Sequence, residues 1–286
     1  YSYAFQVKAG TEITVDPEDQ NVVEYGTAVF TAAGTGAGTP SYQWQKYNDS
    51  TETWEDLDGE TYATLEMEDV AEEDEGRYRC EVTAGCGSVE TEFAELTLAP
   101  RILYCESVKT HGGGVGEIAL EMPEGTPLVE PRRGDLLIRV TFDRPVFADD
   151  GELDDNDLVI EDTAKNTYYA KAMAFNNGSQ GNVLEITVDG AESNKQRLTL
   201  ELLAGKFRRP TSAKAILAGV RAREVRCLVG NVTSSGEVDI LDLSAVKGAL
   251  FTSADQSNAR LDVNLSGDIN VVDMALVKSR IFDSVP

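Results

Sequence analysis

The chain contains the stretch Asn231-Val-Thr-Ser-Ser-Gly-Glu-Val-Asp-Ile-Leu-Asp242, and 31 residues later it contains a second version, Asp262-Val-Asn-Leu-Ser-Gly-Asp-Ile-Asn-Val-Val-Asp273. Each copy leads directly into an amphipathic helical pattern. A twelve-residue loop with oxygen-bearing side chains at positions 1, 3, 5, 9 and 12 is typical of a cage for Ca²⁺. Gly236 and Gly267 supply the sharp turn at position 6. The repeat therefore predicts two loop–helix units, called loop one and loop two below.

The two copies also agree beyond the loops, at Val246/Val277, Lys247/Lys278 and Phe251/Phe282. A pair of calcium loops, each ending in Asp at position 12 and followed by one helix, resembles the type I dockerin module. The resemblance covers about 229–284. It implies a Ca²⁺-stabilised module that binds a cohesin-like protein or another surface protein and attaches secreted proteins to an extracellular scaffold.

The loops depart from the usual dockerin pattern of Asp, Asn and Asp at positions 1, 3 and 5, and each lacks at least one carboxylate. In loop two we expect Ca²⁺ ligands at Asp262, Asn264, Ser266, Asp268 (through its backbone carbonyl), Asn270 (often through water) and Asp273. The equivalent residues of loop one are Asn231, Thr233, Ser235, Glu237, Asp239 and Asp242. Because ligand charge tunes affinity, we expect loop two to bind Ca²⁺ and loop one to bind it weakly or not at all. The alternative is a pair of helices that packs without metal.

The resemblance also assigns partner recognition to loop positions 10 and 11 and to helix positions about a turn and a half further on. These positions hold Ile240, Leu241, Lys247, Gly248, Val271, Val272, Lys278 and Ser279. Many dockerins have small hydroxyl residues at the first two positions, whereas both copies here are aliphatic. Exposed aliphatic pairs would meet a hydrophobic partner or another part of this protein. Alternatively, Leu241 and Val272 are core residues of the helix pair.

Composition limits the classes of partner. The net charge is −25, and residues 1–100 carry 22 acidic and only 4 basic residues. This excess argues against nucleic acid or anionic lipid as partners, which need basic surfaces. No apolar run is long enough for a membrane span, and the sequence contains no signal-peptide pattern. We expect a processed piece of a longer exported protein, located extracellularly or on the cell surface.

Residues 11–99 alternate between short β-prone runs and turn signals, the rhythm of an antiparallel sandwich. Trp44 lies in the middle of one run, and Tyr78 lies two residues before Cys80. Together they resemble the immunoglobulin fold, which implies that Trp44 fills the core and Tyr78 forms a tyrosine corner. Residues 1–10 form a separate strand-like segment, either the end of another domain or a strand donated to a neighbouring subunit.

Residues 100–228 carry a second set of strand-like runs. The segments 138–146 and 150–158 resemble the bacterial immunoglobulin-like domains that precede dockerins in large surface proteins. The predicted fold is therefore mainly β, with two tandem immunoglobulin-like β-sandwiches followed by a small α-helical dockerin-like pair at 229–286. No flexible linker separates the second sandwich from this pair, which predicts a stiff junction.

The four cysteines lack metal-type spacing and indicate two disulfides in an oxidising compartment. Three pairings are possible. The immunoglobulin resemblance places Cys80 and Cys86 across one hairpin, and it places Cys105 and Cys227 on neighbouring first and last strands. It therefore implies the pairs Cys80–Cys86 and Cys105–Cys227.

Nothing in the sequence indicates catalysis. The single histidine, His111, lies in a glycine-rich segment, and no nucleophile–base pair or phosphate-binding loop is recognisable. We therefore expect a non-catalytic attachment module with the sandwiches as spacers. The alternatives are a structural subunit of a self-associating surface layer or filament, and the C-terminal tail of a larger secreted enzyme.

Overall fold

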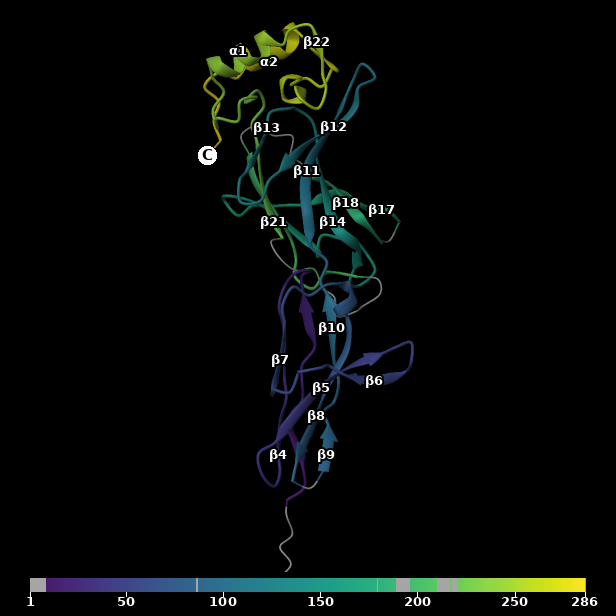
Figure 1. Ribbon diagram of the computed structural model, residues 1–286. Helices are drawn as coiled ribbons and strands as arrows, with labels where there is room; N and C mark the ends of the chain where they lie inside the picture. Colours follow the sequence, from purple (N-terminus) through teal and green to yellow (C-terminus); the bar gives the residue numbers. More distant parts are fainter. Residues whose placement is uncertain are drawn as a thin grey trace, which may run out of the picture. The chain divides into compact units, whose positions relative to one another are not determined.

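The computed structural model describes residues 9–85, 87–178, 180–188, 196–209, 217 and 221–285. The described residues form two compact units that divide between Ala99 and Pro100. The fold is mainly β with two short α-helices near the C-terminal end, as the sequence predicted (Figure 1). Neither helix in the described part of the chain is long and apolar enough to span a membrane. The predicted strand-like segment 1–10, apart from its last two residues, and Cys86 lie outside the described residues.

The first unit is a sandwich whose strands bury alternate residues. Its larger sheet has the order β2-β10-β8-β5-β6, with β9 paired to β8, and two further pairs, β3–β7 and β1–β4, complete it. The strands are β1 (Glu12–Val15), β2 (Gln20–Val22), β3 (Ala28–Thr31), β4 (Ala33–Thr35), β5 (Ser41–Asn48), β6 (Thr53–Asp56), β7 (Thr64–Met67), β8 (Gly76–Ala84), β9 (Gly87–Glu90) and β10 (Ala94–Leu98). A 3₁₀ turn, η1 (Glu72–Asp74), precedes β8.

Three aromatic residues form the centre of this core. Trp44 and Tyr78 are buried, and Phe30 stacks on Tyr78 with ring centroids 5.2 Å apart. The Tyr78 hydroxyl donates to the carbonyl of Asp74 at 2.6 Å, which is the hydrogen bond of a tyrosine corner. Both roles predicted for Trp44 and Tyr78 are confirmed, and Phe30 packs against both rings.

The second unit begins with another two-sheet sandwich. One sheet has the order β12-β11-β14-β18-β17, with β20 paired to β14, and the other has the order β13-β21-β19-β15-β16. The strands are β11 (Ile102–His111), β12 (Gly116–Met122), β13 (Leu128–Glu130), β14 (Leu136–Ala148), β15 (Leu158–Asp162), β16 (Thr167–Tyr168), β17 (Ala170–Asn177), β18 (Gln180–Val188), β19 (Gln196–Leu202), β20 (Phe207–Arg208) and β21 (Ala222–Cys227). Apolar residues from both sheets fill one continuous core.

The structure does not confirm the expected disulfides. We expected Cys105 and Cys227 on neighbouring strands. Instead, Cys105 lies on β11 and Cys227 on β21, which belong to different sheets. Both are buried free thiols in this structure, as is Cys80. Burial raises the pKa of Cys105 and of Cys227 to about 12 and that of Cys80 to about 11. The pairing Cys80–Cys86 falls outside the described residues.

The second unit ends in a small helical module. Its helices are α1 (Ile240–Gly248) and α2 (Val271–Ser279), which pack against each other at the yellow end of the chain (Figure 1). A 3₁₀ turn, η2 (Ala259–Leu261), and two short strands, β22 (Thr252–Ser253) and β23 (Asp268–Ile269), connect them. Val246 and Val277, which match in the repeat, are both fully buried between the helices.

The junction between the second sandwich and the helical module is closely packed. The backbone N–H of Leu228 donates to Glu130, and that of Gly230 donates to Pro131, at 3.1 and 3.0 Å. Ile118 of β12 packs against Ala254 and Ala259 of the helical module. These contacts show that the helical module packs against the second sandwich, and a stiff junction stays a prediction from that packing.

Candidate functional site

The two calcium-type loops have the same backbone turn. Gly236 and Gly267 have φ angles of 92° and 91°, in the left-handed region that favours glycine. Two residues earlier, Ser234 and Leu265 also have positive φ, at 65° and 63°. The sharp turn predicted at position 6 is therefore present in both loops.

Positions 9 and 12 of each loop form a capping box at the start of the following helix. In loop two the Asn270 side chain accepts from the N–H of Val272, and Asp273 Oδ2 accepts from the N–H of Asn270. Asp239 and Asp242 do the same for α1. The sequence analysis treated these residues only as ion ligands and missed this role, although a short polar residue three positions before an acidic one is its usual signature.

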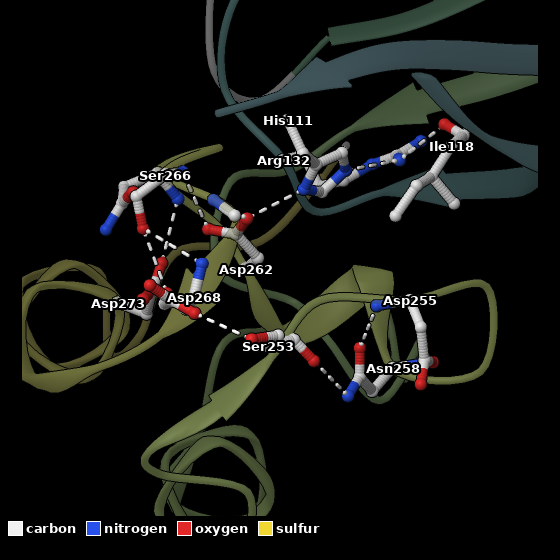
Figure 2. Close-up of polar contacts among 12 residues, drawn as sticks. His111, Ile118, Arg132, Ser253, Asp255, Asn258, Asp262, Ser266, Asp268 and Asp273 are labelled. Atoms are coloured by element: carbon white, nitrogen blue, oxygen red, sulfur yellow. Dashed lines mark hydrogen bonds and ion pairs between the residues drawn. The ribbon is translucent and has the colours of Figure 1, made fainter. Parts of the chain in front are cut away.

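Two of the three carboxylates of loop two, Asp262 and Asp273, are fully buried and receive hydrogen bonds from the loop backbone. Asp262 Oδ1 accepts from the N–H of Ser266 at 3.0 Å, and its Oδ2 accepts from the N–H of Gly267 at 2.7 Å. Asp273 Oδ1 accepts from the N–H of Asn264 at 2.9 Å. Figure 2 shows Asp262 and Asp273 together with Ser266 and Asp268 of the same loop.

The electrostatics of loop two favour a cation. Burial raises the pKa of Asp273, and the nearby charge of Asp262 raises it further. Burial alone would also raise the pKa of Asp262, but hydrogen bonds from His111, Gly267 and Ser266 lower it below its usual value. Among the ion pairs of the described residues, none joins a lysine or arginine to Asp262 or Asp273. Two buried like charges that no lysine or arginine offsets are costly unless a cation lies between them.

The remaining predicted ligands of loop two are neutral oxygen groups. The Ser266 hydroxyl donates to the carbonyl of Asp268 at 2.9 Å, and the Asn270 amide donates to Ser266 Oγ at 3.1 Å. Asn264 is largely buried. Across the described ranges, no three His, Cys, Asp or Glu side chains gather at one point. A donor set of two carboxylates with amide, hydroxyl and carbonyl oxygens fits a hard cation such as Ca²⁺ better than zinc.

Loop one is closed differently. Its position 1 is Asn231, which is fully buried and whose Nδ2 has no hydrogen-bond partner. The backbone N–H and the hydroxyl of Thr233 both donate to Asp242 Oδ1 at 2.8 Å. The Ser235 hydroxyl donates to the carbonyl of Glu237 at 2.7 Å. Thr233, the predicted ligand at position 3, is thus hydrogen-bonded to the carboxylate of Asp242 at position 12. Loop one has one buried carboxylate, whereas loop two has two.

A basic side chain lies against loop one. Arg260 donates to the carbonyls of Val232 and Asn231 at 3.1 and 3.4 Å and to Ser234 Oγ at 2.6 Å. Burial lowers the pKa of Arg260, whereas the charges of Glu130 and Asp242 act to raise it. Arg260 therefore brings a positive charge close to Asp242, the one buried carboxylate of loop one.

His111 contacts loop two, which the sequence analysis missed. It ends strand β11, is buried, and places Nδ1 2.7 Å from Asp262 Oδ2 (Figure 2). The N–H of Gly112 donates to the carbonyl of Leu265 at 2.8 Å. A Cβ at Gly112 would lie 2.8 Å from the Ser266 oxygen, which explains why glycine follows the histidine. The glycine run beside the only histidine of the sequence was the available signal.

The predicted recognition residues lie on the surface. The exposed fractions of Ile240 and Leu241 are 64% and 61%, and those of Val271 and Val272 are 55% and 52%. These values exclude the alternative that Leu241 and Val272 are core residues. Lys247, Gly248, Lys278 and Ser279 are also exposed.

Two exposed phenylalanines, Phe251 and Phe282, accompany the aliphatic pairs. Phe251 follows α1, yet its N–H donates to Ile269, just before α2, at 2.8 Å. Phe282 follows α2, and its N–H donates to Val238, just before α1, also at 2.8 Å. Each aromatic residue is therefore held near the start of the other helix. The sequence analysis noted these residues only as matching positions of the repeat.

Comparison with known families agrees with this geometry. Residues 229–282 match the dockerin type I domain, and residues 12–83 match the immunoglobulin domain. The chain therefore contains a type I dockerin and an immunoglobulin-like domain, as predicted. Both are non-catalytic modules.

Similarities to individual proteins are partial. Endoglucanase C of Cellulomonas fimi is 35% identical over 86 residues, which are 30% of this chain and only 8% of that enzyme. The titin I-band fragment I67–I69 has a TM-score of 0.38 at 13% identity, covering 79% of this chain and 66% of that one. Extracellular domains 3–5 of Drosophila OTK have a TM-score of 0.38 at 14% identity. That match covers 77% of this chain and 62% of the OTK chain. These TM-scores support no inference about function.

Proposed function

We propose that the chain is a non-catalytic attachment module of an extracellular or cell-surface protein. In this proposal a Ca²⁺-stabilised dockerin at 229–286 binds a cohesin-like partner, and the sandwiches at 11–99 and 100–228 act as spacers. The observation that carries the proposal is the pair of exposed aliphatic patches, Ile240/Leu241 and Val271/Val272, within a matched dockerin. Adjacent exposed aliphatic residues at the start of two helices favour a protein interface.

The proposed ion site is loop two. Asp262 and Asp273 would supply the charged ligands, with Asn264, Ser266, the carbonyl of Asp268 and Asn270 completing an oxygen cage. The buried carboxylate pair without a lysine or arginine partner supports this assignment. A bound Ca²⁺ would fix the loop and so the direction in which α2 presents Val271 and Val272.

The proposed partner surface is hydrophobic. Each patch combines an aliphatic pair with one phenylalanine, namely Ile240/Leu241 with Phe282 and Val271/Val272 with Phe251. Such a surface fits a cohesin-like face with apolar pockets better than a polar one, because aromatic and aliphatic anchors dominate binding energy when they are desolvated.

A second candidate function is the non-catalytic tail of a larger secreted enzyme. The similarity to Endoglucanase C over 86 residues supports it. This reading is compatible with the first, because a tail of this kind could carry the dockerin that attaches the enzyme.

The test measures binding of the full chain to a panel of immobilised type I cohesin modules, in Ca²⁺ and in EDTA. We expect Ca²⁺-dependent binding, and we expect the double variant Ile240→Asp/Val271→Asp to bind about 100-fold more weakly, because central interface anchors each contribute about 2 kcal/mol or more. Tyr169→Ser, which alters an exposed residue of the sandwich, is the control. Absence of binding together with self-association in light scattering would instead favour a self-assembling structural subunit.

A further inference from the structure

The second sandwich and calcium loop two share a buried chain of hydrogen bonds. It runs from Glu130 through Arg132 and His111 to Asp262, and all four residues are at most 2% exposed. Figure 2 shows Arg132 and His111 pointing from the sandwich toward Asp262. Buried polar groups destabilise a protein unless each has a hydrogen-bond partner. The way in which these four side chains are paired therefore indicates what each of them does.

Arg132 is held rigidly. Its Nε and Nη2 bind the two oxygens of Glu130 at 2.8 and 2.9 Å. Its Nη1 donates to the carbonyl of Ile118 at 2.9 Å, and its Nη2 donates to the carbonyl of Ser107 at 3.1 Å. A further Nη1 bond reaches His111 Nε2 at 3.2 Å, so all five guanidinium N–H groups have partners.

This arrangement determines the tautomer of His111. A guanidinium can only donate, so His111 Nε2 must accept from Arg132. The proton of the neutral ring therefore lies on Nδ1, which donates to Asp262 Oδ2 at 2.7 Å. Within the described residues Asp262 Oδ1 accepts one hydrogen bond, from the N–H of Ser266, which belongs to the loop itself.

The backbone of loop two is also hydrogen-bonded to the sandwich, through the residues that follow His111 and Arg132. Arg133 donates from its N–H to the carbonyl of Val263 at 3.1 Å and from its Nε to the carbonyl of Asn264 at 3.2 Å. Gly112 donates to Leu265. The sandwich thus contacts loop positions 1 to 4, which include two of the proposed ligands, Asp262 and Asn264.

We propose that His111 is a positioning residue of the calcium site in loop two, with Arg132 fixing its tautomer, so that the second sandwich sets the Ca²⁺ affinity of the dockerin. His111 does not touch the ion. It orients the Asp262 carboxylate, as outer hydrogen-bond partners commonly do for metal ligands. This inference rests on the proposed calcium site.

The test is Ca²⁺ titration calorimetry of the full chain. We expect His111→Ala to weaken Ca²⁺ binding about 10-fold or more, the range typical for losing an outer hydrogen-bond partner. His111→Asn, whose Nδ2 can donate in place of the ring Nδ1, should recover part of the affinity. Thr110→Ala, which changes the exposed neighbouring residue, should bind as the unmodified chain does.

The outcomes separate this inference from the proposed function. If the unmodified chain binds no Ca²⁺, the calcium site itself is wrong and the inference is overturned with it. If the unmodified chain binds Ca²⁺ and folded His111→Ala binds equally well, the site stands and the role of His111 is refuted.

A second measurement needs no substitution, which covers the case that His111→Ala does not fold. The chain has one histidine, so its ring nitrogens give one set of NMR signals. We expect the Nδ1–H tautomer, and we expect both ring signals to shift during a Ca²⁺ titration with the same midpoint as the heat of binding. The Nε2–H tautomer, or ring signals that do not respond while Ca²⁺ binds, would overturn the inference.

Discussion

Loop one and loop two have the same backbone turn and the same capping box but different charges. Loop two buries Asp262 and Asp273, and within the described residues neither forms an ion pair with a lysine or arginine. Loop one buries Asp242 alone and has Arg260 beside it. The comparison teaches that the repeated sequence fixes the shape of the loop, whereas one residue at position 1 and one arginine between the helices decide whether a cation is needed.

The loops also differ in what holds them. Loop two is contacted by His111, Gly112 and Arg133 of the second sandwich. Loop one receives its side-chain support from Arg260, which belongs to the dockerin itself. Loop two is therefore supported by a second domain and, in the proposed function, also by an ion, whereas loop one is supported from within its own module.

The strongest test of this comparison is the matched pair Asp273→Asn and Asp242→Asn. Both variants weaken a capping box, so both should lose about 1 kcal/mol of stability in chelator. Only Asp273→Asn should weaken Ca²⁺ binding, on the order of 100-fold, because ligand charge sets the affinity of such loops. Titration calorimetry and urea unfolding of the full chain give both quantities.

Equal losses of Ca²⁺ affinity in the two variants would break the comparison. That result would mean that loop one also holds an ion and that Arg260 does not replace it. A loss confined to Asp242→Asn would reverse the assignment of the two loops.

A smaller effect is expected for Arg260→Ala. The variant removes charge-assisted hydrogen bonds to Val232, Asn231 and Ser234, which should cost about 2 kcal/mol of unfolding free energy. The Ca²⁺ affinity of loop two should stay unchanged. Arg280→Ala is the control, because its pair with Asp283 at 3.7 Å is partly exposed and contributes between about 0 and 1 kcal/mol. Urea unfolding in chelator measures the difference.

Two results would contradict this expectation. Equal stability of Arg260→Ala and Arg280→Ala would show that Arg260 does not support loop one. A gain of a second Ca²⁺ in Arg260→Ala would show instead that the arginine excludes an ion from a competent loop.

The local features of the site could be predicted from the sequence. The loop turns at Gly236 and Gly267 and the start of each helix follow from residue types at fixed spacing. The strand positions of Trp44 and Tyr78 follow from alternation and from one short motif. Signals of this kind are local, so a single sequence is enough to find them.

The contact between His111 and Asp262 could not be predicted, because the two residues are 151 positions apart. It depends on β11 running on as far as His111. The same limit explains the error about Cys105 and Cys227, since strand order within a sandwich is a tertiary property. The position of Arg260 beside loop one is also a tertiary property, so it could not be predicted from the sequence.

The smallest effect on stability is expected where the two repeats are alike. Phe251 and Phe282 are 84% and 93% exposed, so Phe251→Ala and Phe282→Ala should each change the free energy of unfolding by less than about 0.5 kcal/mol. Both should weaken cohesin binding if the phenylalanines belong to the two patches. Urea unfolding and the cohesin assay measure these effects in parallel. A large stability loss in one variant alone would show that its ring packs into the module, and the difference between the repeats would then extend from the loops to the partner surface.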